Sequence, residues 1–181
     1  MHQSTKGQFP TRKQIRLVGR DYASPGAYFI TILTAKRSHL FSSIHGGKAH
    51  LNTIGEIACE EWLATPTVRP NFHVEKDFTV FMPDHMHAVL WILDENGIPV
   101  VYSYADSQRI VSHGYAAQSV SSVISHFKAQ VTRRVREMLN QPSYKIWHRG
   151  YYETIIRDQD HLENVHRYIQ NNPYRWQERH R

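Results

Sequence analysis

Two histidines that flank a single hydrophobic residue are the side chains of this sequence best suited to chemistry. His85-Met86-His87 is followed at once by an apolar run from Ala88 to Ile92, which is typical of a buried strand. Because alternate residues of a strand point to the same side, the two imidazoles would project together, with Cα atoms roughly 6–7 Å apart. Two imidazoles at that spacing can chelate one metal ion. The alternative is a pair of partly exposed histidines that bind nothing.

Two polar residues near the other end of the chain could complete such a site. Tyr168 and Asn172 are four residues apart, so on a helix they share one face, which we place apart from the apolar stripe of Leu162, Val165 and Ile169. Two imidazole nitrogens and one amide oxygen suit Mg²⁺ or Mn²⁺ with open positions. A tyrosine one turn away could then present its hydroxyl to a phosphate. The alternatives are a tyrosine at the edge of the core and an asparagine at a helix end.

The hydrophobic pattern predicts seven elements that would position these residues. They are a strand over 27–34, a helix from Thr53 closed by Pro66 and Pro70, strands over 74–82 and 85–92, a helix from about Ser119 to 140, a strand over 151–156, and a last helix from Asp158 or Asp160 that stops before Pro173. The first six follow the βαββαβ order of the ferredoxin-like fold. We therefore predict an α+β protein: an antiparallel four-stranded sheet with helices on one face, plus a C-terminal helix that carries Tyr168.

Several details of these elements are also predicted. Thr53 and Glu56 have the spacing of a capping box, and Gly46-Gly47 marks a turn. Residues that we expect on one side of their strand are Val74, Phe78, Val80 and Met82, and those that form the stripe of the long helix are Val120, Val123, Ile124, Phe127, Val131, Val135 and Met138. Residues 1–181 are interpreted as one domain, with a basic arm over 1–25 and a loop over 94–118.

The composition limits the classes of partner and compartment. Lys and Arg number 22 against 16 Asp and Glu, a formal net charge of +6, which favours a polyanionic partner. The apolar runs are too short for a membrane span, and the N-terminal residues have no apolar core of a secretory signal. Cys59 has no second cysteine to pair with. We therefore expect a cytoplasmic protein.

A longer set of motifs resembles the single-tyrosine HUH transposases, and within them the REP-associated tyrosine transposases. The similar stretch runs from about Arg12 to Trp176. The motifs that carry it are Arg12 to Gly19, Asp21-Tyr22, Pro25 to Ile32, Pro83 to His87, Trp147 to Glu153, Ile156-Arg157 and Tyr168 to Pro173. The His-hydrophobic-His motif alone is weak, but together with the downstream Tyr-Ile-x-x-Asn-Pro it is specific.

The resemblance implies a role for each matching position. His85 and His87 would bind Mg²⁺ or Mn²⁺ with Asn172 as third ligand, and Tyr168 would be the catalytic nucleophile. The implied reaction cleaves and rejoins single-stranded DNA through a 5′-phosphotyrosine, on DNA that carries a REP-like hairpin. The implied enzyme is a bacterial, nucleoid-associated monomer or homodimer. The basic residues that we predict to contact the DNA backbone are Arg12, Lys13, Arg16, Arg20, Lys128, Arg133, Arg134 and Arg136.

Two other functions remain as alternatives. One is a catalytically silent protein, derived from a transposase, that binds structured single-stranded DNA. The other is a histidine-triad phosphohydrolase, which would need a third histidine where Val89 stands. For the transposase, the group that takes the proton of Tyr168 is open: His166 and Glu153 are candidates, and structural roles are the alternative for both.

Overall fold

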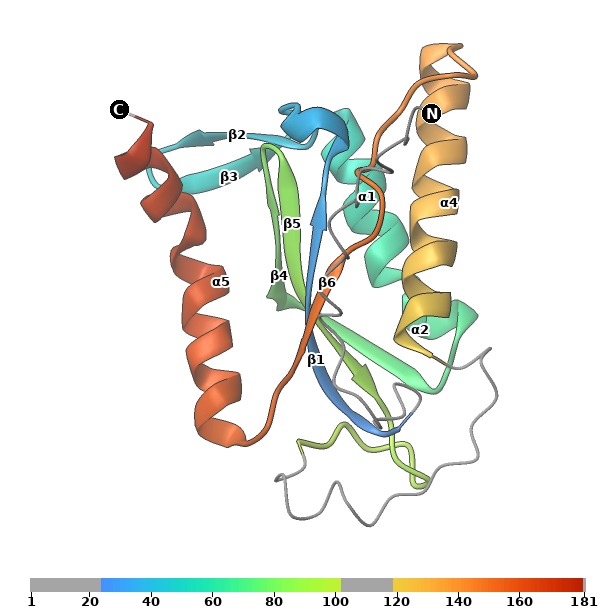
Figure 1. Cartoon of the computed structure of the whole chain (residues 1–181), viewed down its shortest axis with the longest axis vertical. Helices are drawn as coiled ribbons and strands as arrows, with labels where there is room; N and C mark the ends of the chain where they lie inside the picture. The colour runs from blue at the N-terminus through green and yellow to red at the C-terminus, as the bar shows by residue number, and fades with distance from the viewer. Residues whose placement is uncertain (1–23, 102–118, 181) are drawn as a thin grey trace, which may run out of the picture.

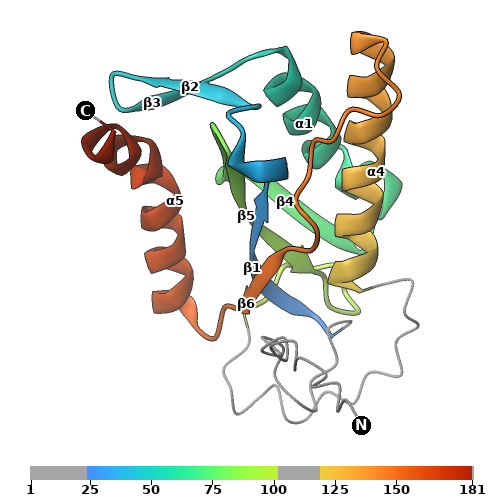
Figure 2. The same cartoon turned by 45° about the horizontal axis from the view of Figure 1, so that its top comes forward.

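A four-stranded antiparallel sheet with the strand order β4-β5-β1-β6 forms the centre of the structure. This computed structural model describes residues 24–101 and 119–180. The strands of the sheet and the longer helices are β1 (Gly26–Leu33), α1 (Thr53–Leu63), β4 (Phe72–Met82), β5 (His85–Ile92), α4 (Val120–Leu139), β6 (Tyr152–Ile155) and α5 (Gln159–Arg179). Helices α1 and α4 lie on one face and α5 on the other (Figures 1 and 2). This arrangement confirms the predicted ferredoxin-like α+β fold.

The two central strands have apolar side chains on both faces. Along β5, Met86 and Leu90 belong to the core under α1 and α4, whereas Val89 and Trp91 belong to a second core under α5. The side chains of β1 alternate between the two cores in the same way. Strand β1 pairs with β5 so that Thr31 lies opposite His87. His85 and His87 have the parity of Val89 and Trp91. They therefore face α5.

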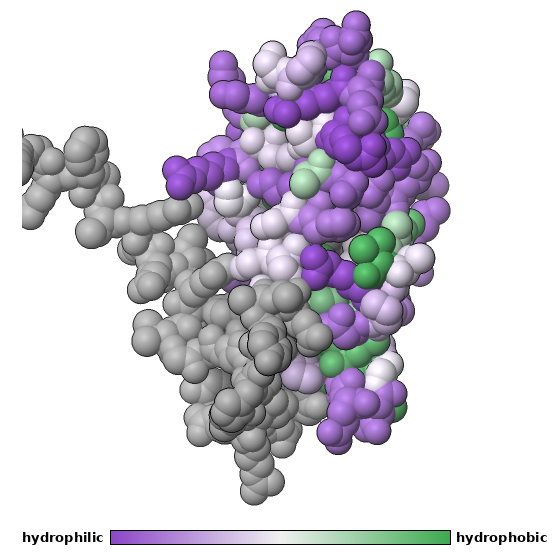
Figure 3. All heavy atoms as spheres, turned by 90° about the vertical axis from the view of Figure 1, so that its right-hand side faces the viewer, coloured by the Kyte–Doolittle hydropathy of each residue, from purple (hydrophilic) through white to green (hydrophobic). Residues whose placement is uncertain are grey.

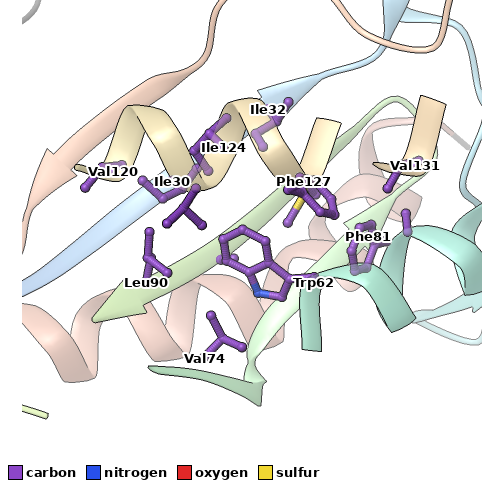
Figure 4. Close-up of a cluster of buried hydrophobic side chains, with 14 of the residues drawn as sticks. Ile30, Ile32, Trp62, Val74, Phe81, Leu90, Val120, Ile124, Phe127 and Val131 are labelled. Atoms are coloured by element: carbon purple, nitrogen blue, oxygen red, sulfur yellow. The ribbon is translucent and has the colours of Figure 1, made fainter. Parts of the chain in front are cut away.

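The larger core lies between the sheet and the pair α1 and α4 (Figure 4). Trp62 of α1 is fully buried, packs edge-on against Phe127 of α4 at 5.2 Å between ring centroids, and donates through Nε1 to the Thr79 hydroxyl at 3.1 Å. The predicted stripe of α4 is buried from Val120 to Val135. Met138 was wrongly included, because Leu139, four residues after Val135, continues the stripe and leaves Met138 exposed.

A β-bulge changes which side chains of β4 share a face. The pairing of β4 with β5 shifts register between Val74 and Thr79. Val74 therefore packs in the core under α1 and α4, whereas Phe78 and Val80 pack under α5. The prediction that these residues lie on one side was wrong, because the five steps from Val74 to Thr79 match only two steps on β5, from Leu90 to Ala88. An odd number of extra residues in a strand reverses the face of the side chains that follow.

The segment between β1 and α1 contains structure that the sequence pattern did not predict. A short hairpin, β2 (Ser42–His45) with β3 (Lys48–Leu51), turns at the predicted Gly46-Gly47. A one-turn 3₁₀ helix, η1 (Ala35–Arg37), follows β1. The cap of α1 is Asn52 rather than Thr53, since its side chain accepts from the amide of Gly55 at 3.0 Å. Pro66 does not simply close α1, because it lies in the first turn of a further short helix, α2 (Thr65–Val68).

Helix α5 continues through Pro173 to Arg179, so the prediction that it stops before this proline was wrong. Proline removes one helical hydrogen bond. Packing compensates for this loss, because Pro173 and Trp176 are both buried. Of the helices in the described ranges, none has the length and apolar character that crossing a membrane requires.

Candidate active site

The site is built on the face of β5 that α5 covers. His85 and His87 are 8% and 6% exposed, and their ring centroids are 4.6 Å apart at an interplanar angle of 74°. The Phe29 ring on the neighbouring strand stacks on His87 at 5.3 Å. The prediction that the two imidazoles project to the same side of the strand is therefore confirmed, and both rings are buried.

Helix α5 brings three side chains at four-residue spacing to this pair. The Tyr168 hydroxyl lies 3.3 Å from Nε2 of His87, and the Trp176 ring lies 6.0 Å from that of His85. Asn172 stands midway between Tyr168 and Trp176 on the same helical face and is 2% exposed. The helix therefore places the Asn172 amide between two residues that contact the histidines, and all four predicted site residues converge within one chain.

The position of Asn172 on the helix differs from the prediction in one respect. With α5 extended past Pro173, the buried positions Val165, Ile169, Asn172 and Trp176 form one continuous stripe. Asn172 is thus a polar member of the apolar stripe rather than part of a separate face. Tyr168, at the margin of the stripe, is 39% exposed and its hydroxyl lies at the border of the buried cluster.

Burial keeps both histidines neutral at physiological pH. Loss of hydration lowers the pKa of His87 to about 3, with smaller contributions from neighbouring His85 and from Arg37. Loss of hydration also lowers the pKa of His85, against an opposing hydrogen bond and charge from Asp84. Neutral imidazole is the form that binds metal ions.

The Nδ1 atoms of both rings have hydrogen-bond partners. His85 Nδ1 lies 2.6 Å from Asp84 Oδ1, and His87 Nδ1 lies 2.8 Å from the Thr31 hydroxyl. Such partners orient metal-binding imidazoles and direct their Nε2 lone pairs. Sequence reasoning missed both. Asp84 had been included only in the motif Pro83 to His87, with no role of its own, and Thr31 is recognisable only once the register of β1 against β5 is known.

The donor set fits a metal ion because it contains an unsatisfied buried acceptor. Asn172 Oδ1 is buried and has no hydrogen-bond partner in the described structure, which normally costs about 1–3 kcal/mol. Nowhere in residues 24–101 and 119–180 do three or more His, Cys, Asp or Glu side chains form a group that could hold a metal ion. A third ligand beside the two imidazoles would therefore have to be of another residue type, and Asn172 stays the predicted one.

The predicted proton acceptors for Tyr168 are not at the site. Glu153 pairs with Ile30 across the sheet and accepts from the Tyr151 hydroxyl, so it lies on the opposite face. The His166 ring packs against Phe78 at 4.4 Å. The group in contact with the Tyr168 hydroxyl is His87.

The predicted DNA-contacting residues fall into two groups. Four of them, Arg12, Lys13, Arg16 and Arg20, lie outside the described residues. The other four lie on α4, on the sheet face away from Tyr168, and the molecular surface on this side is largely hydrophilic (Figure 3). Each has an intramolecular partner. Lys128 donates to the carbonyls of His148 and Gly150, and Arg136 donates to the carbonyl of Tyr144. Arg133 forms an ion pair with Glu137, and Arg134 forms ion pairs with Glu60 and Glu61. Their role in DNA binding stays a prediction.

Acidification is expected to destabilise the metal-free protein through His87. Between pH 6.5 and 3 the unfolded chain binds a proton that folded His87 does not, so stability falls as pH decreases through this window. At pH 5 the contribution is on the order of 2 kcal/mol. Urea unfolding with EDTA, at pH 7 and pH 5, measures the difference. His87→Gln should reduce it, and an equal pH dependence in wild type and variant would contradict the assignment.

The chain is similar to known proteins both in sequence and in structure. Residues 105–172, which include Tyr168 and Asn172 but not the histidine pair, match the sequence model of the IS200-like transposases. An uncharacterized protein of Haemophilus influenzae is 32% identical over 168 residues, which cover 92% of this chain and 91% of that protein. The structure is similar, with a TM-score of 0.57, to that of a REP-associated tyrosine transposase bound to a REP hairpin. That similarity covers 88% of this chain and 73% of the other at 20% identity, and it supports the fold.

Proposed function

The chain belongs to the IS200-like transposase family, and we propose that it is a metal-dependent transposase and endonuclease that cuts and rejoins single-stranded DNA through a covalent 5′-phosphotyrosine. One observation carries the proposal. The Tyr168 hydroxyl from α5 lies 3.3 Å from Nε2 of His87 on β5, and Asn172, one helical turn after Tyr168, is buried with an oxygen that has no partner among the described residues. The proposed nucleophile and the three groups proposed to bind a metal ion thus come from a single chain.

Tyr168 supplies the oxygen that attacks a backbone phosphorus. A bond forms between the phenolic oxygen and phosphorus, the bond from phosphorus to the 3′ oxygen breaks, and the strand leaves with a 3′-hydroxyl. The phosphotyrosine keeps an ester bond, so a 3′-hydroxyl can attack it in reverse and rejoin two strands without another energy source. Cleavage and joining are therefore one reaction run in two directions.

The surroundings of Tyr168 suit an orienting role for His87. A phenol has a pKa of about 10 and a proton to lose, but His87, with its pKa lowered to about 3, is too weak a base to keep that proton. The contact instead places the hydroxyl of Tyr168 beside the nitrogen of His87 that would bind the cation. The Phe29 ring meets the Tyr168 ring edge-on at 5.9 Å and limits its rotation. Positioning of this kind is a main source of rate in phosphoryl transfer.

His85, His87 and Asn172 are the residues that would hold the cation, Mg²⁺ or Mn²⁺. When bound, it would act as a Lewis acid that polarises a non-bridging phosphate oxygen. Two neutral nitrogens and an amide oxygen leave the cation's full positive charge available to the phosphate. The buried setting strengthens this attraction relative to bulk water.

Hairpin-containing single strands are the substrate that we propose. The structurally similar tyrosine transposase is bound to a REP hairpin, and the net charge of this chain is positive. Binding should therefore weaken as the salt concentration rises. The alternative, a catalytically silent DNA-binding protein, would have no use for a buried neutral histidine pair and an unsatisfied asparagine, both of which cost stability.

The experiment that tests the proposal incubates the protein with a hairpin-bearing single strand and Mn²⁺. A strand labelled at its 3′ end should appear as a protein–DNA adduct on a denaturing gel, because the tyrosine joins the 5′ phosphate of the downstream piece. A strand labelled at its 5′ end should appear as a shorter free product. EDTA should prevent both. Binding without adduct or cleavage, over a panel of hairpins that the protein retains on native gels, would favour the silent binding protein.

A further inference from the structure

A half-buried ion pair connects the histidine pair to Arg37, almost fifty positions earlier in the chain. Asp84 is 4% exposed, and its two carboxylate oxygens have different partners. Oδ1 lies 2.6 Å from Nδ1 of His85, and Oδ2 lies 2.7 Å from Nε of Arg37. The contacts form one chain, Arg37–Asp84–His85, that begins at the surface and ends at the proposed metal site.

The backbone around Arg37 is built to hold this contact. Lys36 and Arg37 have φ angles of 55° and 57°, a left-handed conformation that residues other than glycine rarely adopt. Hydrogen bonds to two other segments hold the 3₁₀ turn η1 in place. The amide and the hydroxyl of Thr34 both donate to the carbonyl of Asp84 at 3.0 Å, and the amide of Ala35 donates to the carbonyl of Ile146 at 2.7 Å. A strained turn persists when its surroundings determine it, and such turns gather at functional sites.

We propose that Arg37 and Asp84 are positioning residues that fix which nitrogen of His85 carries the proton. A guanidinium can only donate hydrogen bonds, so it fixes one carboxylate oxygen. A carboxylate can only accept, so its second oxygen requires a hydrogen on Nδ1 of His85. The lone pair is then on Nε2, free for the cation. This inference rests on the proposed function for the cation, but the proton position itself is a property of the metal-free protein.

His87 provides the contrast within the same site. Its Nδ1 partner is the Thr31 hydroxyl, which can donate or accept, so Thr31 does not determine the proton position. His85 is therefore the histidine whose Nε2 carries a free lone pair already in the metal-free protein. The commitment comes from Arg37 and Asp84 together.

Arg37 and Asp84 together predict that Asp84→Asn lowers the affinity for Mn²⁺ and that a second substitution, Arg37→Ala, restores it. The donor-only Arg37 attracts the amide oxygen of Asn, so the amide NH₂ turns toward His85 and donates to Nδ1. The proton of His85 then moves to Nε2, and Mn²⁺ affinity should fall roughly 10–100-fold, the usual effect of losing an outer partner of a metal ligand. Adding Arg37→Ala frees the amide to rotate and should recover most of the affinity. Arg37→Ala alone should keep the proton on Nδ1.

Two measurements test this in the whole chain. Long-range ¹H–¹⁵N correlation spectra of the metal-free protein report which nitrogen of His85 is protonated, and Mn²⁺ titration followed by electron paramagnetic resonance reports affinity. Asp94→Asn is the matched control and should change neither, because in the described part of the chain the Asp94 carboxylate accepts hydrogen bonds from two amides of its own turn, Asn96 and Ile98. A thermal melt of each variant confirms folding. Rescue by a second substitution cannot arise from general loss of structure.

The outcomes separate the pair from the proposed function. A proton on Nε2 in Asp84→Asn that returns to Nδ1 in the double variant supports the pair, whatever the affinity for Mn²⁺. An unchanged proton position in Asp84→Asn, or a double variant no better than the single one, overturns it. If the wild-type protein binds no Mn²⁺, or if His87→Ala leaves its affinity unchanged, the proposed metal site fails instead.

Discussion

Tyr168→Phe is expected to eliminate the covalent protein–DNA adduct while the protein still binds its hairpin strand. The substitution removes one oxygen, the proposed nucleophile, and keeps the ring that packs edge-on against Phe29 and His87. Because the hydroxyl is near the border of the buried cluster and its neighbours are unchanged, the fold should be retained. Transfer of a 3′-labelled strand to the protein on a denaturing gel measures the effect, and retention on a native gel measures binding.

Tyr174→Phe is the matched control for this experiment. Tyr174 lies on the same helix and is 57% exposed, and nothing places its hydroxyl near the histidines. This variant should form adduct at the wild-type rate. If Tyr168→Phe still forms the adduct, or if only Tyr174→Phe loses it, Tyr168 is not the nucleophile. The contact between Tyr168 and His87 would then have no catalytic role.

Asn172→Leu is expected to have effects of opposite sign on stability and on metal binding. Leucine keeps the branching and the number of side-chain heavy atoms of asparagine, with two larger methyl groups, and it removes a buried oxygen that has no partner among the described residues. The metal-free protein should therefore gain on the order of 1 kcal/mol of unfolding free energy. Mn²⁺ affinity should fall by more than the roughly 10–100-fold that loss of an outer-shell contact causes, because a direct ligand is removed. Adduct formation should fall with it.

Urea unfolding with EDTA measures the first effect and Mn²⁺ titration the second. Asn171→Leu is the control: the neighbouring asparagine is exposed, and its amide only donates to the carbonyl of Arg167 one turn back. This control should leave Mn²⁺ affinity unchanged. A less stable Asn172→Leu that binds Mn²⁺ normally would show that the asparagine is a structural residue rather than a ligand.

Much of the fold could be predicted from hydrophobic periodicity, and the failures have particular causes. The strands β1 and β5 and the helix α4 were found because their apolar residues recur without interruption. The faces of β4 were wrong because a bulge has no clear signature in the sequence. The end of α5 was wrong because a local rule about Pro173 was outweighed by burial of Trp176, a tertiary effect. The hairpin of β2 and β3 has strands too short to show a period.

The sequence by itself determined which residues could do chemistry. His85, His87, Tyr168 and Asn172 were named from residue type, spacing and resemblance, since a two-residue repeat on a strand and a four-residue repeat on a helix fix which side chains share a face. Only the tertiary structure decided that α5 lies against the histidine face, where Tyr168 reaches His87 and Asn172 is buried without a partner. It also revealed Thr31 and Asp84 as partners of the histidines, and Arg37 as the partner of Asp84. Contacts between residues fifty to eighty positions apart depend on strand register and helix docking, and no local pattern encodes either.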